Sequence, residues 1–176
     1  TDARLDGTDG VVSVTARIRN LRGFKCDSAT VSGGSTSQQA ISERVDGDWI
    51  FMASIRVPDA SIWWPHTHGA QPLYDVSVKL GSGESTVRLA LGRVGFREVQ
   101  LDSTQGKFQL RINAADVFWR GACWCPPAPF GLRSSREQYR RLLELARDAG
   151  MNMLRVGGTM VYEHDDFYDL CDELGI

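Results

Sequence analysis

Two short motifs carry side chains of the kind that bind metals. Cys123 and Cys125 form a Cys-x-Cys pair, which is shorter than the Cys-x₂₋₄-Cys pairs of zinc ribbons. His66 and His68 form a His-x-His pair between a proline and a glycine, with no acid or cysteine beside it. We therefore expect a surface loop at the histidines and no metal site. For the cysteines we expect free structural thiols, with one disulfide as the alternative; the other two are Cys26 and Cys171.

Three acidic residues near the end of the chain resemble candidate acid–base groups. Glu163, Asp165 and Asp166 stand directly before a run with apolar residues at helical spacing. The run holds Phe167, Leu170, Cys171 and Leu174. Acids at a helix start stabilise the helix dipole, and an aspartate can cap the first turn. We therefore expect Asp165 or Asp166 as the N-cap, Gly175 at the C-terminal cap, and no catalytic role for the three acids.

An aromatic loop offers a possible sugar platform. Trp63 and Trp64 are adjacent and followed by Pro65. Indole rings stack on sugar faces, but they also bury large areas inside a protein. We expect Trp64 to be mostly buried where the two halves of the chain meet. The alternative is a non-catalytic carbohydrate-binding or scaffold module in which Trp63 and Trp64 bind the ligand.

Composition and charge narrow the classes of partner. Hydrophobic residues make up 42% and charged residues 24%, as in an ordinary globular protein. The formal net charge of −2 does not favour binding to nucleic acid or to an anionic membrane. No apolar run approaches the roughly 20 residues of a membrane-spanning helix. We expect neither nucleic acid nor a membrane as partner.

The first half of the chain is typical of an all-β domain. Its runs alternate apolar and polar residues and are separated by turn signals, with 32–39 as a linker. The expected strands cover 11–18, 28–31, 40–45, 49–57, 73–80 and 85–91. This spacing predicts an immunoglobulin-like β-sandwich.

The second half changes to an alternation of strands and helices. A hairpin is expected from 108–112 and 117–121, and its second strand also opens the alternation. A helix begins at Ser134 or Ser135 and ends at Gly150, and a strand covers 153–156. Such an alternation predicts a parallel sheet, whose ligands gather at the carboxyl ends of the strands.

Three segments together resemble glycoside hydrolase family 2, in its β-mannosidase branch. They are the loop WWPHTHGAQPLY, the passage from GFR to RGACW, and the block from DAGMNMLRV to YEHDDFYDLCDELGI. The resemblance covers most of 62–176. It implies an immunoglobulin-like β-sandwich over 1–97, followed over 98–176 by the first βα units of a (β/α)₈ TIM barrel.

The resemblance also implies an activity and its missing parts. Members are similar to one another in being retaining exo-glycosidases with two glutamates on later barrel strands, which would lie outside these residues. We therefore expect no catalytic residue here, an inactive fragment, and no cofactor. The expected partners are an oligosaccharide or glycan substrate and a cover for the open barrel edge, either the remainder of the polypeptide or a second copy.

Two residues are expected to bind the substrate. Trp124 would form a platform under a sugar ring, or alternatively cap the barrel. Arg155 would hydrogen-bond a hydroxyl or position a carboxylate, or alternatively pair with buried acids.

Two positions depart from the family pattern: Gly157 stands where a tryptophan is usual, and Asn113-Ala114 replaces Asn-Gly.

Overall fold

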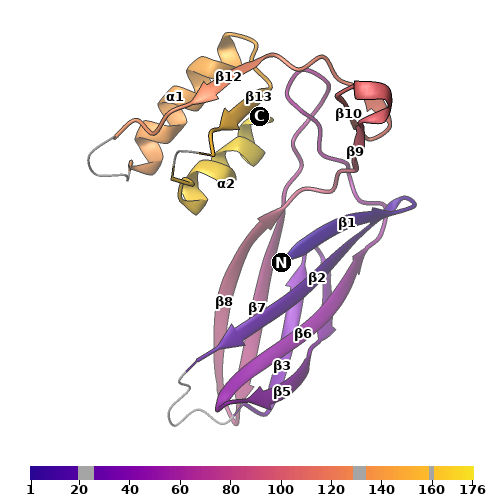
Figure 1. Cartoon of the computed structure of the whole chain (residues 1–176). Coiled ribbons are helices and arrows are strands. Elements are labelled where there is room, and N and C mark those ends of the chain that lie inside the picture. The colour runs from indigo at the N-terminus through magenta and orange to yellow at the C-terminus, as the bar shows by residue number, and fades with distance from the viewer. Residues whose placement is uncertain (20–25, 129–133, 159–160) are drawn as a thin grey trace. The chain divides into compact units, whose positions relative to one another are not determined.

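The computed structural model describes residues 1–19, 26–128, 134–158 and 161–176 (Figure 1). They form two compact units. The first unit holds 1–61 and 74–96, and the second holds 62–73 and 97–176. The predicted domains, 1–97 and 98–176, stay a prediction; the structure adds that segment 62–73 packs with the second unit.

The first unit is a β-sandwich of two four-stranded antiparallel sheets. The sheet orders are β1-β2-β6-β5 and β4-β3-β7-β8. Val12 and Phe51 from one sheet and Val31 and Val78 from the other are fully buried in one core, as the period-two pattern predicts. The strands are β1 Asp2–Asp6, β2 Asp9–Ile18, β3 Ser28–Gly33, β4 Thr36–Gln39, β5 Ile41–Val45, β6 Asp48–Val57, β7 Tyr74–Ser82 and β8 Ser85–Val94.

Two parts of this sandwich differ from the sequence-based expectation. β1 was not predicted, and it pairs with β2 across a turn in which Gly7 has φ 67°. The predicted linker 32–39 is wrong, because it forms the hairpin of β3 and β4. β4 is an edge strand whose residues are largely exposed, so it has no buried face to produce an apolar alternation.

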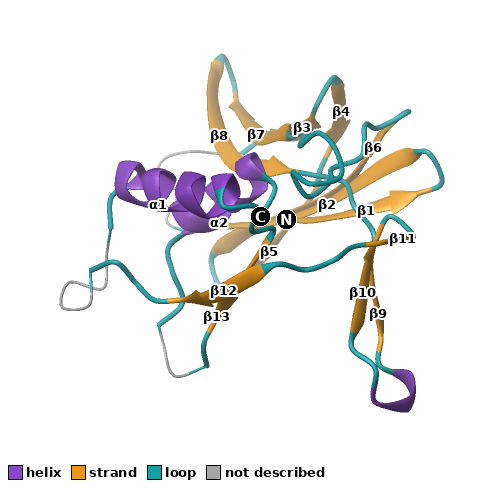
Figure 2. Ribbon diagram, turned by 90° about the horizontal axis from the view of Figure 1, so that it is seen from above, coloured by secondary structure: helices purple, strands orange, loops and turns teal. Residues whose placement is uncertain are grey.

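The second unit contains a small antiparallel sheet and a parallel pair. β9 Val99–Asp102, β10 Gln109–Ile112 and β11 Ala115–Asp116 form the antiparallel sheet, with a short 3₁₀ turn at Thr104–Gly106. β12 Gly121–Trp124 pairs in parallel with β13 Met153–Val156. The helices α1 Arg136–Asp148 and α2 Asp165–Leu174 lie on one side of this pair (Figure 2).

Local signals explain both helices. Ser135 caps α1 and forms a capping box with Gln138, as predicted. Gly175 ends α2 with φ 75°, also as predicted. The predicted N-cap of α2 is wrong, because His164 occupies that position without a side-chain cap. Asp165 and Asp166 lie inside the first turn, where they stabilise the helix dipole.

The first parallel strand begins later than predicted. The sequence pattern placed it at 117–121, whereas β12 covers 121–124. The backbone before it is held by Asn152, whose side chain accepts from the Arg120 amide and donates to the Phe118 carbonyl. At Gly121 the two strands approach so closely that a Cβ would lie 1.9 Å from the Met153 carbonyl oxygen. Glycine therefore marks the true start of the parallel pairing.

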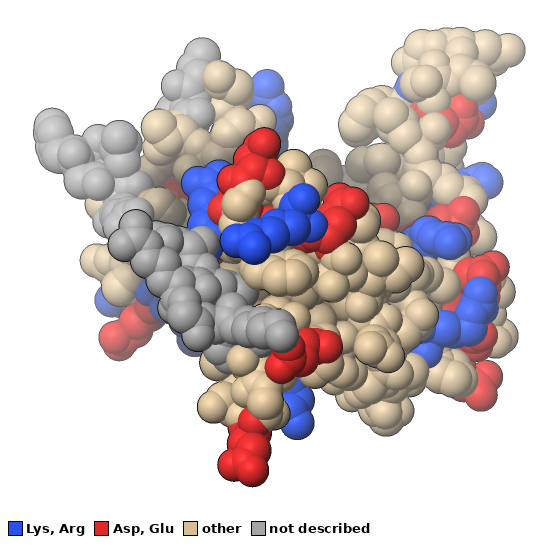
Figure 3. Space-filling model, turned by 90° about the horizontal axis from the view of Figure 1, so that it is seen from below, with Lys and Arg blue, Asp and Glu red and all other residues tan. Residues whose placement is uncertain are grey.

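The charged side chains and the helices of the described residues bear on possible partners. On the face drawn in Figure 3, basic and acidic side chains lie next to one another. Such mixing gives no extended field of one sign on that face. Within the described ranges, no helix combines the length and apolar character needed to cross a bilayer.

The turn between β10 and β11 generates a prediction. Asn113 and Ala114 both have positive φ, 51° and 64°, and alanine tolerates this region poorly. Ala114→Gly is expected to raise the free energy of unfolding by about 0.5–1 kcal/mol, measured by urea denaturation of the chain. Ala115→Gly is the matched control in a strand and is expected to lower it by a similar amount. A destabilising Ala114→Gly would refute the strain argument.

Candidate functional site

The carboxyl ends of β12 and β13 present two different faces. Cys123 is in register with Arg155, and Trp124 is in register with Val156. Trp124 and Val156 pack against α1 and α2, and because side chains alternate along a strand, Cys123 and Arg155 point away from the helices. The structure therefore does not bring the two predicted substrate-binding residues, Trp124 and Arg155, together.

The face turned away from the helices is hollowed. A cavity of about 360 Å³ is lined by Trp119, Gly121, Ala122, Cys123, Met153 and Arg155. Arg155 is exposed, and its Nη1 donates to Cys123 Sγ at 3.7 Å. Among the described residues the guanidinium has this one hydrogen-bond partner, so other donors could reach a carboxylate or a sugar hydroxyl. On this face a ligand in the cavity could contact the positively charged side chain of Arg155.

The face turned toward the helices holds a buried carboxylate. Glu163 is 7% exposed, and its Oε1 accepts from Trp124 Nε1 at 2.8 Å. Its Oε2 accepts from the hydroxyl of Tyr139. The helix-start role predicted for Glu163 is wrong, because the residue precedes α2 and its side chain points into the core of the second unit.

Trp124 is positioned by this carboxylate and by an aromatic neighbour. The indole is 8% exposed, and its ring centroid lies 4.8 Å from that of Phe167. Its N–H is occupied by Glu163. Sugar binding by Trp124 or Arg155 stays a prediction. A cue to the Glu163 contact was the tryptophan itself, since a buried indole N–H needs an acceptor.

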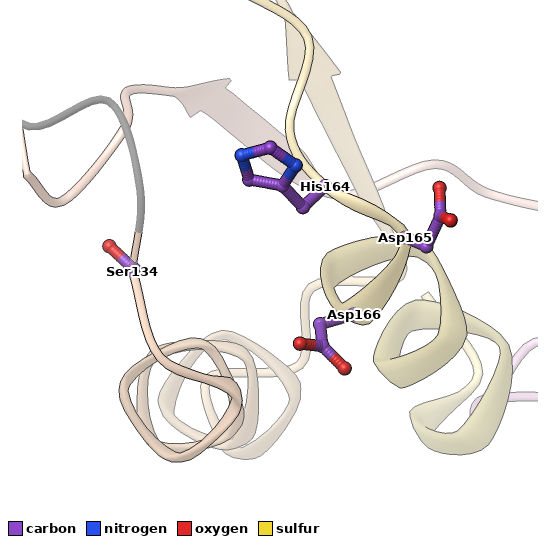
Figure 4. Close-up of a pocket in the computed structure, with 4 residues that line it drawn as sticks. All are labelled: Ser134, His164, Asp165 and Asp166. Carbon is purple, nitrogen blue, oxygen red and sulfur yellow. The ribbon is translucent and has the colours of Figure 1, made fainter.

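A second cavity lies at the amino-terminal ends of the helices. It measures about 430 Å³ and is lined by Ser134, His164, Asp165 and Asp166 (Figure 4). Asp166 accepts from Arg136 Nη1 at 2.8 Å, so part of its charge is balanced. The acidic lining makes this cavity a poor site for an anionic ligand.

The aromatic loop is part of the second unit and packs at the opposite end of the parallel pair. Trp63 is 4% exposed, and its Nε1 donates to the Asp172 carbonyl at 2.7 Å. The Arg97 guanidinium lies 4.4 Å from the centre of the Trp63 ring and pairs with the Asp172 carboxylate. Trp63 is therefore unavailable as a sugar platform. Trp63 is the more enclosed of the two tryptophans, while Trp64 is partly buried and stacks on His68. Burial of Trp64 where the two halves of the chain meet stays a prediction.

Of the two histidines of this loop, His66 makes hydrogen bonds to the backbone and His68 is exposed. His66 Nε2 donates to the Met151 carbonyl, and the His66 amide donates to the Gly175 carbonyl. His68 is exposed, as expected for a surface loop. Both His66 contacts lie before β13 and after α2, which is the amino-terminal end of the strands. In parallel βα sheets that end serves stability, while ligands bind at the other.

The remaining candidate groups are the four cysteines and the side chains that could bind a metal ion. All four cysteines are free, and burial raises the pKa of the Cys171 thiol to about 12. Such a thiol stays protonated and unreactive at neutral pH. Within the part of the chain that the structure describes, no three His, Cys, Asp or Glu residues gather in a way that would hold a metal ion.

The two tryptophans of the loop give a matched test. Trp63→Ala is expected to lower the free energy of unfolding by roughly 3–5 kcal/mol, and Trp64→Ala by clearly less, because only Trp63 is fully enclosed. Trp63→Phe keeps a ring but loses the bond to Asp172, at a cost of about 1 kcal/mol. Urea denaturation measures all three variants. A larger loss for Trp64→Ala than for Trp63→Ala would contradict the assignment.

Comparison with known proteins places these features in a family. The sequence profile of glycosyl hydrolases family 2 matches residues 2–97. β-Mannosidase B of Aspergillus terreus is 32% identical over 181 aligned positions, which cover 100% of this chain and 21% of that protein. The β-mannosidase of Capra hircus is 40% identical over 120 positions, which cover 65% of this chain and 14% of that protein.

A solved structure shows a likeness in fold over nearly the whole chain. The crystal structure of β-D-mannosidase from Dictyoglomus thermophilum matches with a TM-score of 0.80 and 29% identity, over 99% of this chain and 23% of that one. The chain thus spans between 14% and 23% of the length of these relatives. With the profile match and the β-mannosidase relatives together, the chain belongs to glycosyl hydrolases family 2, in its β-mannosidase-like branch.

Proposed function

We propose that the whole protein is a retaining exo-glycosidase that cleaves β-mannosidic bonds, and that this chain supplies its β-sandwich and the start of its (β/α)₈ barrel. The observation that carries the proposal is the parallel β12–β13 pair, covered by α1 and α2 on one face and bearing Arg155 on the other. The family supports it, since the relatives above are β-mannosidases by name.

The proposed enzyme contains a (β/α)₈ barrel that the second unit begins. A barrel of this type closes eight parallel strands in about 250 residues. The second unit contributes two βα units, and their outer surfaces are uncovered. Leu142 and Leu145 of α1 are 36% and 60% exposed, although apolar residues of barrel helices normally meet a neighbouring helix. Further βα units would pair with the edges of β12 and β13 and cover these leucines.

The chemistry requires two carboxyl groups. One protonates the departing glycosidic oxygen while the other, about 5 Å away, attacks the anomeric carbon and forms a covalent glycosyl intermediate. Water then hydrolyses this intermediate with the first group acting as base. Glu163 cannot serve as half of such a pair while both its oxygens accept from Trp124 and Tyr139. Both catalytic glutamates would therefore come from later barrel strands.

Arg155 has a defined place in this scheme. It lies at the carboxyl end of β13, on the face that would turn toward the barrel interior. A guanidinium there attracts a carboxylate and holds it ionised, which is the state that a nucleophile needs. Gly157, one residue beyond β13, removes the indole that the family pattern has at this position. We expect this loss of aromatic surface to weaken the preference for mannose over glucose.

Assays of two polypeptides test the proposal. The complete polypeptide that the gene encodes is expected to release nitrophenol from p-nitrophenyl β-D-mannoside, more slowly from the β-glucoside, and not from the α-mannoside. The 176-residue chain by itself is expected to release nothing above buffer from the same substrates, because a lone carboxyl cannot complete the double displacement.

Two results would overturn the proposal. One is a complete polypeptide that binds or cleaves no β-glycoside. The other is turnover by the 176-residue chain that survives purification and disappears in Glu163→Gln, since this would make Glu163 a catalytic residue. Arg155→Met in the complete polypeptide is expected to reduce kcat/KM strongly, while Arg4→Met, at an exposed position in β1, serves as the control for loss of charge.

A further inference from the structure

Glu163 is a buried carboxylate to which the proposed reaction gives no role. It lies between β13 and α2, directly before His164, and is 7% exposed. Removing a carboxylate from water is costly unless hydrogen bonds replace the lost hydration. An apolar side chain of the same volume would fill the space without this cost. The carboxylate therefore needs a reason other than packing.

The two partners of Glu163 come from two different segments. Trp124, the last residue of β12, donates to Oε1, and Tyr139, in the first turn of α1, donates to Oε2. One side chain thus joins the end of β12, the start of α1 and the connection that leads into α2. All three segments lie at the end of the parallel pair where ligands bind.

The donors keep their protons at neutral pH. An indole N–H does not titrate in this range. Burial, together with the hydrogen bond to Glu163, raises the pKa of the Tyr139 phenol. Tyr139 is fully buried, so its hydroxyl has little water to turn to. Both donors therefore carry the protons that these two hydrogen bonds need at neutral pH.

The bond to Trp124 fixes more than one side chain. Trp124 also rests against Phe167 of α2, so its ring is held from two directions. Cys123 precedes it on the same strand and faces the cavity with Arg155. When the helix-facing side chain of Trp124 is held, the end of β12 frays less, so Cys123 on the opposite face keeps one orientation.

We propose that Glu163 is a positioning residue, which locks Trp124 and thereby holds the carboxyl end of β12 in the conformation that receives the substrate. The inference rests on the proposed glycosidase function. Glu163 acts through Trp124 and does not touch the sugar. Its role is to orient the strand ends before the substrate arrives, which lowers the cost of bringing the reacting groups into line.

Two substitutions separate positioning from catalysis and from simple packing. In Glu163→Gln the amide oxygen can accept from Trp124 and the amide nitrogen can donate to the Tyr139 oxygen, so positioning survives. In Glu163→Leu the volume is kept but both acceptors are lost. Glu137→Leu, at an exposed position in the first turn of α1, is the control for loss of an acid.

The first measurement uses the 176-residue chain labelled with ¹⁵N, in which five tryptophans give five indole signals. We expect slow hydrogen exchange at the Trp124 indole in the unchanged chain, in Glu163→Gln and in Glu137→Leu. In Glu163→Leu we expect exchange faster by about tenfold or more. Equal exchange in Glu163→Leu and the unchanged chain would overturn the proposal, since Trp124 would then be held without Glu163.

The second measurement uses the complete polypeptide and an aryl β-mannoside, well below the unfolding temperature of every variant. We expect Glu163→Gln to keep kcat/KM close to that of the unchanged protein, and Glu163→Leu to lower it by about tenfold or more. An unchanged kcat/KM in Glu163→Leu would mean that Glu163 only fills space. A nearly inactive Glu163→Gln would make Glu163 a catalytic residue. Either result overturns the proposal. If the unchanged polypeptide is inactive, the proposed function fails, and the exchange measurement alone still decides whether Glu163 positions Trp124.

Discussion

The side chain of Asn152 is the contact on which the second unit depends. It is 1% exposed, and it donates to Thr67 in the aromatic loop and to the Phe118 carbonyl, while its oxygen accepts from the Arg120 amide. One amide therefore ties β13 to the approach to β12 and to a loop more than eighty residues earlier. Loss of Asn152 would remove three hydrogen bonds, each worth about 0.5–1.5 kcal/mol, and Thr67 would keep only its bond with His68.

This arrangement separates stability from function along the strands. At the amino-terminal end, Asn152, Trp63 and His66 satisfy backbone groups and enclose aromatic surface. At the carboxyl end, Arg155 faces an open cavity and Glu163 holds Trp124. The first end thus fixes the register of the parallel pair, and in the proposed enzyme the second end would present side chains to a ligand.

Sequence reasoning succeeded where the signal was local and failed where it was distant. The capping box of α1 and the apolar spacing of α2 are local signals, so both helices were predicted, apart from the N-cap of α2. Glu163 and Trp124 are separated by 39 positions, and Trp63 and Asp172 by 109, so no spacing rule reveals these contacts. The start of β12 was misplaced for the same reason, because Asn152 decides it from 32 positions away.

We propose that β12 and β13 are the first strands of a barrel that further βα units would close. Amide hydrogen exchange on the 176-residue chain, dilute and shown to be monomeric, tests it most directly. We predict that the amides of Met153–Val156, whose residues are only partly buried or exposed, exchange faster than those of the sandwich core strands β2 and β6. Protection of Met153–Val156 equal to that of the sandwich core in a proven monomer would contradict the account, because the pair would then be complete without further strands.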